Sequence, residues 1–224
     1  MSSIFVGIDV QVQRGCCCAF VDENGFLLDS DWSDDPRNEL VQNIRKIASG
    51  FDKAHVGIDA PRLPLTSKRE YYWDGRKQRW RKRRENEKGF GRHCEIVISA
   101  HGIAKPQWTP LADITPEWMQ TGFEIFQSLN LVAETYEVFP SASYSLLRGI
   151  RDVRLNVNFS DCWSGPKDVL DSWVAAITVH EFIKGRGCEV GGGDGLGTII
   201  LPRPLPNPII QAVLEWPENS EGLG

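Results

Sequence analysis

The chain has 224 residues and a net charge of −5, and 41% of its residues are hydrophobic. This composition excludes a disordered chain, and the length suits one domain with a moderate insertion or at most two small domains. No apolar run approaches the ~20 residues of a membrane span, and the N-terminus lacks signal-peptide features, so we expect a cytoplasmic protein. In that compartment the six cysteines are expected to be thiols, and their spacing does not suit a zinc site.

Charge is distributed unevenly along the chain. Residues 62–92 contain twelve Lys and Arg but four acidic residues, whereas the rest of the chain contains 13 basic and 26 acidic residues. Because Tyr and Trp are interleaved with these cations, we expect nucleic acid, DNA or RNA, as the partner. A solvated helix face would produce the same pattern, and Arg79–Arg84 also resembles a nuclear localisation signal. The expected nucleic-acid contacts are Lys68, Arg69, Arg76, Arg79, Arg81, Arg83 and Arg84.

Hydrophobic periodicity and turn signals predict alternating strands and helices. Strands are expected at residues 4–9, 16–21, 26–32, 55–59, 95–100, 131–139 and 198–201. Helices are expected at about residues 36–49, 68–88, 115–129, 141–150 and 166–184. The turn Asp22-Glu23-Asn24-Gly25 makes the first three strands an antiparallel meander. We expect one domain over residues 1–202, with the basic segment 62–92 as a largely helical insertion and residues 203–224 as a loosely held Pro-rich tail.

Acidic residues follow or end several predicted strands. Asp9 ends the first strand, its Val-Gly-Ile-Asp motif recurs at Val56–Asp59, and Glu137 lies near the end of the strand at 131–139. Ligands of open α/β sheets bind outside the carboxyl ends of strands. Asp168 and Asp171 are three residues apart in the last helix, so they share a face. Small Ala175 would let that helix pack closely, and we expect all five acids to converge.

Converging carboxylates repel one another, and burying them costs several kcal/mol each unless a cation neutralises them. Mg²⁺ prefers carboxylate oxygens, and two such ions roughly 3.5–4 Å apart can activate a water and stabilise a leaving phosphodiester oxygen. The expected cofactor is therefore Mg²⁺ or Mn²⁺, as two ions. The expected catalytic residues are Asp9, Asp59, Glu137, Asp168 and Asp171. All of them except Glu137 are expected metal ligands, with either Asp168 or Asp171 as the principal helix ligand.

Each acid also has a simpler explanation. An Asp after a strand is often a turn former. The negative charge of Asp168, in the first turn of a helix, interacts favourably with the helix dipole without any further role. Glu137 could pair with an arginine such as Arg148. The glycine-rich residues 191–197 lack the Lys-Ser/Thr of a phosphate-binding loop, and we interpret them as a hairpin turn.

Five motifs together resemble domain-of-unknown-function family 429, and the resemblance spans residues 4–202. They are Gly7-Ile8-Asp9, Gly57-Ile58-Asp59-Ala60-Pro61, Tyr136-Glu137-Val138-Phe139-Pro140, the run from Lys167 to Ala176, and Gly193-Asp194-Gly195 to Pro202. Members of that family are regarded as predicted nucleases of the ribonuclease H-like superfamily. The resemblance and the order of elements imply an α/β, ribonuclease H-like fold. It would have a mixed five-stranded sheet, three antiparallel strands plus two parallel ones, with helices on both faces and the basic helical insertion after strand four.

The sequence departs from the family pattern in two places. Val10-Gln11-Val12-Gln13 is bulky and polar where a small residue usually follows the first acid, and Ser172-Trp173 replaces alanine in the last helix. The expected function is a metal-dependent nuclease that hydrolyses phosphodiester bonds by a two-metal-ion carboxylate mechanism. The alternative is a non-catalytic nucleic-acid-binding or regulatory protein on the same fold. An actin-like phosphotransferase also begins with Gly-Ile-Asp but needs a second domain, for which this chain has no room.

Overall fold

The computed structural model describes residues 2–36, 38–148, 165–205 and 211–217. Its centre is a five-stranded sheet with the strand order β3-β2-β1-β4-β7. The strands are β1 (Ser3–Asp9), β2 (Cys16–Val21), β3 (Leu27–Ser33), β4 (Lys53–Asp59) and β7 (Glu134–Glu137). Strands β1, β2 and β3 pair antiparallel, and β4 and β7 continue the sheet parallel to β1. The α/β class and the predicted mixed sheet are therefore confirmed.

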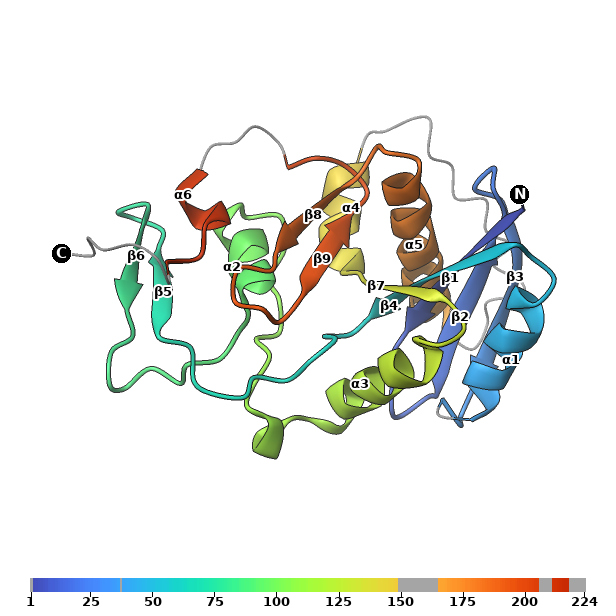
Figure 1. Ribbon diagram of the computed structural model, residues 1–224, viewed down its shortest axis with the longest axis horizontal. Coiled ribbons are helices and arrows are strands. Elements are labelled where there is room, and N and C mark those ends of the chain that lie inside the picture. Colours follow the sequence, from blue (N-terminus) through green and yellow to red (C-terminus); the bar gives the residue numbers. More distant parts are fainter. Residues whose placement is uncertain (1, 37, 149–164, 206–210, 218–224) are drawn as a thin grey trace.

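Helices cover both faces of the sheet, as the sequence predicts (Figure 1). Helices α1 (Glu39–Ala48) and α3 (Glu117–Leu129) pack on one face, and α5 (Pro166–Ile183) packs on the other beside α4 (Pro140–Leu147). The alternation along β1 divides its side chains between these layers. Ile4, Val6 and Ile8 join the α1/α3 core, whereas Phe5 joins the α5 core. No helix in the described ranges combines the length and apolarity needed to cross a membrane.

The repeated Val-Gly-Ile-Asp motif lets α5 lie directly on the sheet. A Cβ added to Gly7 would lie 1.8 Å from the Ser172 carbonyl oxygen, and one added to Gly57 would lie 2.7 Å from Val179 Cγ2. Any larger residue at either position would push the helix away from β1 or β4. Ala175 lets the helix pack closely, as predicted, because its Cβ lies only 2.9 Å from the position that a Cβ on Gly7 would occupy. This close packing brings the first turns of α5 to the carboxyl ends of the strands.

The basic segment is a hairpin, so the prediction of a helix at 68–88 was wrong. Strand β5 (Tyr71–Asp74) pairs antiparallel with β6 (Arg79–Lys82), and the pair Trp73–Trp80 faces across it. Consecutive aromatic residues favour a strand, and Asp74-Gly75 is a turn signal that the abundance of Arg and Lys obscured. Asp74 Oδ1 accepts hydrogen bonds from the backbone N–H groups of Arg76 and Lys77, both at 3.1 Å.

Residues 95–100 are helical rather than the predicted strand. They belong to α2 (His93–Ala100), whose start is held by the Glu95 carboxylate accepting the Arg92 backbone N–H at 3.2 Å. A short apolar run cannot be assigned to helix or strand by periodicity alone. The predicted strand at 198–201 is β9 (Thr198–Leu201), which forms a hairpin with β8 (Cys188–Gly191), a strand that the sequence reading missed. The interpretation of residues 191–197 as a hairpin turn is confirmed.

The C-terminal segment is packed rather than loosely held over residues 211–217. Helix α6 (Gln211–Leu214) lies beside α2 and β6, and Val213 is fully buried. Trp80 Nε1 donates to the Ala212 carbonyl at 2.8 Å, and His93 Nε2 lies 2.8 Å from the Val213 carbonyl oxygen. Residues 206–210 and 218–224 of the predicted tail, and 149–150 of the predicted helix, lie outside the described residues. A short 3₁₀ helix, η1 (Ala112–Ile114), precedes α3.

Candidate active site

Four aspartates meet at one edge of the sheet. Asp9 and Asp59 are the last residues of β1 and β4 and are paired in register. By alternation they point to the same face as Gly7 and Gly57, which is the face that α5 covers. Asp168 and Asp171 lie in the first turns of α5, and Asp9, Asp168 and Asp171 are 5%, 1% and 5% exposed. The structure thus brings together four of the five predicted acids.

The two strand acids have raised pKa values. Burial raises the pKa of Asp9 to about 6, and the charges of Asp171 and Asp168 raise it further against the hydrogen bond from Gln11. Burial also holds the pKa of Asp59 well above its usual range, and the charges of Asp9 and Asp171 act in the same direction. Raised carboxylate pKa values mean that the ionised forms are poorly compensated by the surrounding chain.

Gln11 links the strand acid to the helix acid. Its Nε2 donates to Asp9 Oδ2 at 2.8 Å and to Asp168 Oδ1 at 2.7 Å. Gln11 belongs to the segment where the sequence departs from the family pattern, so the departure lies at the centre of the site. An amide supplies two N–H donors but no positive charge. Gln11 therefore holds the two carboxylates in place without neutralising them.

The cations nearest to the helix acids are exposed. Lys167 pairs with Asp171 Oδ2, and Arg14 Nη2 lies 3.1 Å from Asp168 Oδ2, while the side chains of Lys167 and Arg14 are 80% and 57% exposed. Asp168 Oδ2 is buried and accepts no hydrogen bond within the described chain. The Tyr144 hydroxyl donates to Asp171 Oδ1 at 2.7 Å. Solvent screens exposed ion pairs, so they offset only part of the charge.

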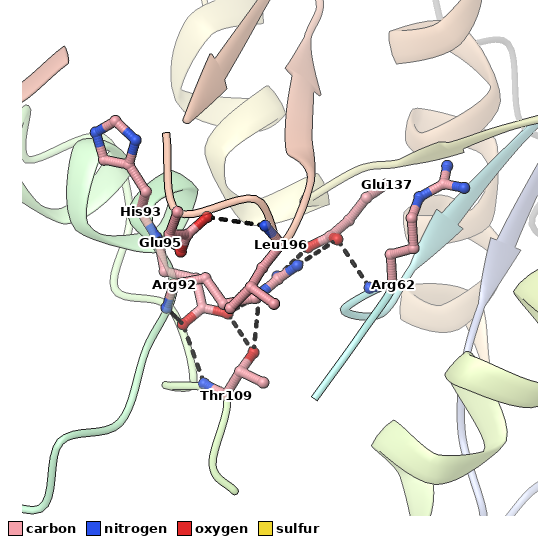
Figure 2. A network of polar contacts seen from close by, with 8 residues as sticks. Arg62, Arg92, His93, Glu95, Thr109, Glu137 and Leu196 are labelled. Carbon is pink, nitrogen blue, oxygen red and sulfur yellow. Dashed lines mark hydrogen bonds and ion pairs between the residues drawn. The ribbon is translucent and has the colours of Figure 1, made fainter. Parts of the chain in front are cut away.

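Glu137 occupies a different environment at the same edge. In the pairing of β4 with β7 it lies opposite Ile58, one position short of Asp59. Side chains alternate along strands, so this register directs Glu137 to the face opposite Asp9 and Asp59. There Arg92 donates to both its oxygens, from Nη1 to Oε2 at 2.7 Å and from Nη2 to Oε1 (Figure 2). Glu137 therefore lies near the aspartates at the same pocket, but from the opposite face of the sheet, and its partner is Arg92 rather than Arg148.

Arg92 and Glu95 form a buried polar network with Glu137 that sequence reasoning missed. Arg92 is 1% exposed, and its Nη2 and Nε donate to Glu95 Oε1 at 3.0 and 3.1 Å. Thr109 N donates to Glu95 Oε2 at 3.0 Å, and Arg62 N donates to Glu137 Oε2 at 2.8 Å (Figure 2). The raised pKa of Arg92 opposes the effect of its burial and follows from the charge of Glu137. The i, i+3 spacing of Arg92 and Glu95 is compatible with such a pair but does not indicate that Arg92 is buried.

A pocket of about 680 Å³ opens beside these groups. Asp9, Asp59, Asp171 and Glu137 line it, but Asp168 does not. This favours Asp171 over Asp168 as the helix acid that faces a ligand. The rest of the lining includes the buried Arg92–Glu95 pair, Glu117, three exposed cations and two aromatic side chains; the exposed cations are Arg14, Lys105 and Lys167, and the aromatic side chains are Trp118 and Phe139.

The predicted nucleic-acid contacts lie elsewhere. None of the seven basic residues lines this pocket, and the β5–β6 hairpin lies at the opposite end of the molecule from β1 and β2 (Figure 1). Arg81 is committed to Glu87, with Nη1 to Oε2 at 2.8 Å and Nη2 to Oε1 at 2.5 Å. Trp80 is 7% exposed and packs edge-on against Trp73, with ring centroids 5.4 Å apart. Trp80 is therefore an anchor rather than a stacking platform for bases.

The donor types at the aspartate cluster suit a hard divalent cation. Asp9 and Asp59 supply carboxylate oxygens with raised pKa values, and no cation in the described chain forms an ion pair with either residue. In the described part of the chain, no three His, Cys, Asp or Glu side chains are already arranged to hold an ion together. Gln11 and Lys167 contact oxygens that a cation would use. Binding an ion at Asp9, Asp59 and Asp171 would therefore require these two side chains to move.

The site can thus be described only from the residues of this chain. The resemblance of the chain to family 429 remains a prediction. The chain matches no protein-family model, no curated protein and no solved structure.

Proposed function

We propose that the protein is a metal-dependent nuclease, with Asp9, Asp59 and Asp171 as the residues that would hold Mg²⁺ or Mn²⁺. One observation carries the proposal: carboxylates from two strand ends and one helix, buried at Asp9 and Asp171 and half-buried at Asp59, meet beside an open pocket. The only cations that pair with the acids of this cluster in the described chain are exposed. Burying such charges costs several kcal/mol each. A divalent cation would offset that cost and would lower the pKa values of Asp9 and Asp59.

The chemistry of the site follows from the charge that surrounds the pocket. When bound, hard divalent cations supply activation of a water and stabilisation of the leaving oxygen, and two ions together can do both. The exposed cations Arg14, Lys105 and Lys167 suit the non-bridging oxygens of a phosphodiester. Trp118 and Phe139 line the same pocket and offer apolar surface to a sugar or base. Close packing of α5 on β1 keeps the acids at fixed positions.

We also infer that the fold is ribonuclease H-like and that the family-429 resemblance reflects relationship. The inference is supported by the meander β1–β3, the parallel strands β4 and β7 beside it, and a helix that crosses β1 with its acids at the strand ends. Fold similarity transfers function weakly. The nuclease proposal therefore depends on the aspartates rather than on the fold.

Cleavage assays test the proposal. Single strands, duplexes, RNA–DNA hybrids and branched junctions would be incubated with Mg²⁺ or Mn²⁺ and the native protein, Asp9→Asn or Asp29→Asn. Asp29 is an exposed residue on β3, so its variant is a matched control for the loss of one carboxylate. We expect cleavage by the native protein and by Asp29→Asn, and a loss of at least about a hundredfold in Asp9→Asn. If Asp9→Asn cleaves nucleic acid as fast as the active native protein does, the aspartate cluster is not the catalytic centre.

A non-catalytic nucleic-acid-binding protein is the second candidate. It is favoured by Gln11, whose amide bridges Asp9 and Asp168, and by Lys167 on Asp171, because these contacts already hold the acids without a metal. Binding to nucleic acid that survives Asp9→Asn, without cleavage by the native protein in either metal, would favour this candidate over the nuclease.

A further inference from the structure

A second pocket lies at the base of the β5–β6 hairpin. Its volume is about 500 Å³, and it is lined by residues 65–71 together with Gly91, Asp194, Leu196 and Trp216. None of these residues lines the candidate active site. Any ligand of this pocket would therefore bind away from the aspartate cluster.

Arg69 is an uncompensated cation in the wall of this pocket. Its guanidinium carbon lies 4.0 Å from the ring centroid of Tyr72 and 5.1 Å from that of Trp108. Nε and Nη1 are enclosed and have no hydrogen-bond partner, and no carboxylate in the described chain forms an ion pair with Arg69. Burial lowers the pKa of Arg69 below its usual value and outweighs the opposing effects of the Tyr72 hydroxyl and of the more distant charges of Glu95 and Glu87. Burying a guanidinium whose N–H groups have no hydrogen-bond acceptor costs free energy of folding, and a bound anion would reduce that cost.

Gly91 makes this arrangement possible. Its φ is +96°, and a Cβ there would lie 2.4 Å from the Trp108 ring and 3.3 Å from Arg69 Nη1. A side chain at this position would be strained and would displace the ring or the guanidinium. The loop is thus shaped to admit the aromatic ring beside Arg69, which fixes the plane of the cation without supplying a counter-charge.

The neighbouring residues add donors more than acceptors. Thr66, Ser67 and Lys68 are exposed, and their side chains form no hydrogen bond within the described chain. The two acids of the lining compete little for these donors. Asp194 already accepts the backbone N–H groups of His93 at 2.7 Å and Leu196 at 3.1 Å, and Glu70 is exposed to solvent. Hydroxyl, ammonium and guanidinium donors in one pocket are the set that phosphate oxygens use.

We propose that this pocket binds a phosphate group through the side chains of residues 66–69. The phosphate can be the terminal group of a nucleic acid, an internal phosphodiester or a free anion, and these share the same chemistry. The inference does not depend on the nuclease proposal, because it involves none of the aspartates. It explains why the Arg69 guanidinium lies beside two aromatic rings without an ion-pair partner among the described residues.

Binding measurements test the proposal. Calorimetric titrations would compare inorganic phosphate, a 5′-phosphorylated oligonucleotide and the same oligonucleotide with a 5′-hydroxyl. The proteins would be the native chain, Arg69→Gln and Arg79→Gln, the last being an exposed arginine on β6 of the same hairpin. We expect saturable binding that is weakened about tenfold in Arg69→Gln and unchanged in Arg79→Gln. Thermal melting checks that each variant is folded.

The outcomes separate the phosphate sources. Binding of the 5′-phosphorylated strand alone identifies a terminal phosphate, equal Arg69-dependent binding of both strands identifies an internal phosphodiester, and Arg69-dependent binding of phosphate alone identifies a free anion. If Arg69→Gln does not fold, the same titrations are made with Lys68→Gln, a change at an exposed residue. We expect this variant to bind the phosphate ligand several-fold more weakly than the native protein.

Two results would overturn the proposal. One is the absence of saturable binding to all three ligands by the native protein. The other is an equal loss in Arg79→Gln and the pocket variants, which would indicate unspecific attraction. Asp9→Asn is expected to bind phosphate like the native protein, so failure of the nuclease proposal leaves this test intact.

Discussion

Two groups of acids at one sheet edge have opposite electrostatic environments. Glu137 is enclosed with Arg92, a buried cation that donates to both its oxygens. Asp9 and Asp59, on the neighbouring strands, have no cation bonded to them in the described chain. Burial raises the pKa of all three carboxyl groups, but the charge and hydrogen bonds of Arg92 act against that rise only at Glu137. The difference follows from one step of strand register, which directs Glu137 and Asp59 to opposite faces. Carboxylates compensated within the chain are structural, and those left uncompensated are available to a ligand.

The largest effect is expected from Arg92→Ala. The change leaves Glu137 and Glu95 buried without their partner, and breaking a buried pair typically costs about 3–5 kcal/mol of unfolding free energy. Urea denaturation at neutral pH measures it, with Arg79→Ala on the exposed side of β6 as the control, expected within about 0.5 kcal/mol of the native protein. A cost of Arg92→Ala no larger than that of Arg79→Ala would show that the network is not a structural unit.

In the absence of metal, Asp9→Asn is expected to raise the free energy of unfolding, whereas Arg92→Ala lowers it. The folded-state pKa of about 6 exceeds the ordinary value of 3.8, so the native state binds the proton more tightly than the unfolded state does. The wild type therefore loses stability as pH rises from about 4 to 6. Removing the charge should stabilise the protein by about 3 kcal/mol at pH 8, and the gain should vanish at pH 4.

Denaturation in a chelator at the two pH values measures this effect. Asp29→Asn, at an exposed site on β3, serves as the control and is expected to show no comparable dependence on pH. A less stable Asp9→Asn at pH 8 would contradict the view that the Asp9 charge is uncompensated.

A smaller effect is expected from Gln11→Ala. Its amide occupies oxygens of Asp9 and Asp168 that a cation would need, so its removal should tighten Mn²⁺ binding by up to about tenfold. Electron paramagnetic resonance of free Mn²⁺ measures the affinity without relying on activity. Gln13→Ala, from the same loop, is the control. A weaker affinity in Gln11→Ala would instead mean that the amide organises the acids for the ion.

The smallest effect is expected from Glu87→Gln on the hairpin. Arg81 lowers the pKa of Glu87 to about 2, but the side chains of Arg81 and Glu87 remain 26% and 20% exposed. An exposed pair contributes about 0.2–1 kcal/mol, and its contribution falls with salt and is lost as pH falls toward 2. Thermal melts at low and high salt measure it. A loss of more than about 2 kcal/mol of unfolding free energy would show that the hairpin depends on this pair. It would contradict the expectation that a partly exposed pair contributes less than the buried network of Arg92.

The sheet could be predicted from the sequence because β1, β2 and β4 are apolar and β2 and β3 are joined by a clear turn signal. The repeated Val-Gly-Ile-Asp motif indicated both the strand ends and the close approach of α5, which the contacts of Gly7 and Gly57 explain. The basic segment was mispredicted because its many Arg, Lys, Gln and Glu residues favour a helix and outweigh the turn signal Asp74-Gly75, while Trp80 of the hairpin also contacts the C-terminal segment. Local propensity does not contain those contacts.

The aspartates of the candidate site could also be predicted, but their partners could not. Asp9, Asp59, Asp168 and Asp171 follow from strand ends and helix spacing. The separate environment of Glu137 depends on register, which is set by pairing across strands far apart in sequence. Arg92 was counted only as one of many basic residues, and nothing local distinguishes a buried arginine from an exposed one. The bulky, polar residues 10–13 mark the position of Gln11 in the sequence, but its contact with Asp168 exists only when α5 is packed on the sheet.

Anomalous diffraction from crystals grown with Mn²⁺ at pH 8 tests the central claim most directly. We predict an ion within about 2.5 Å of carboxylate oxygens of Asp9, Asp59 and Asp171, with Gln11 and Lys167 displaced from the positions they hold here. Crystals of Asp9→Asn should lack that ion. Manganese bound only elsewhere in the native crystals, with Gln11 still bridging Asp9 and Asp168, would contradict the claim that the uncompensated acids form a metal site.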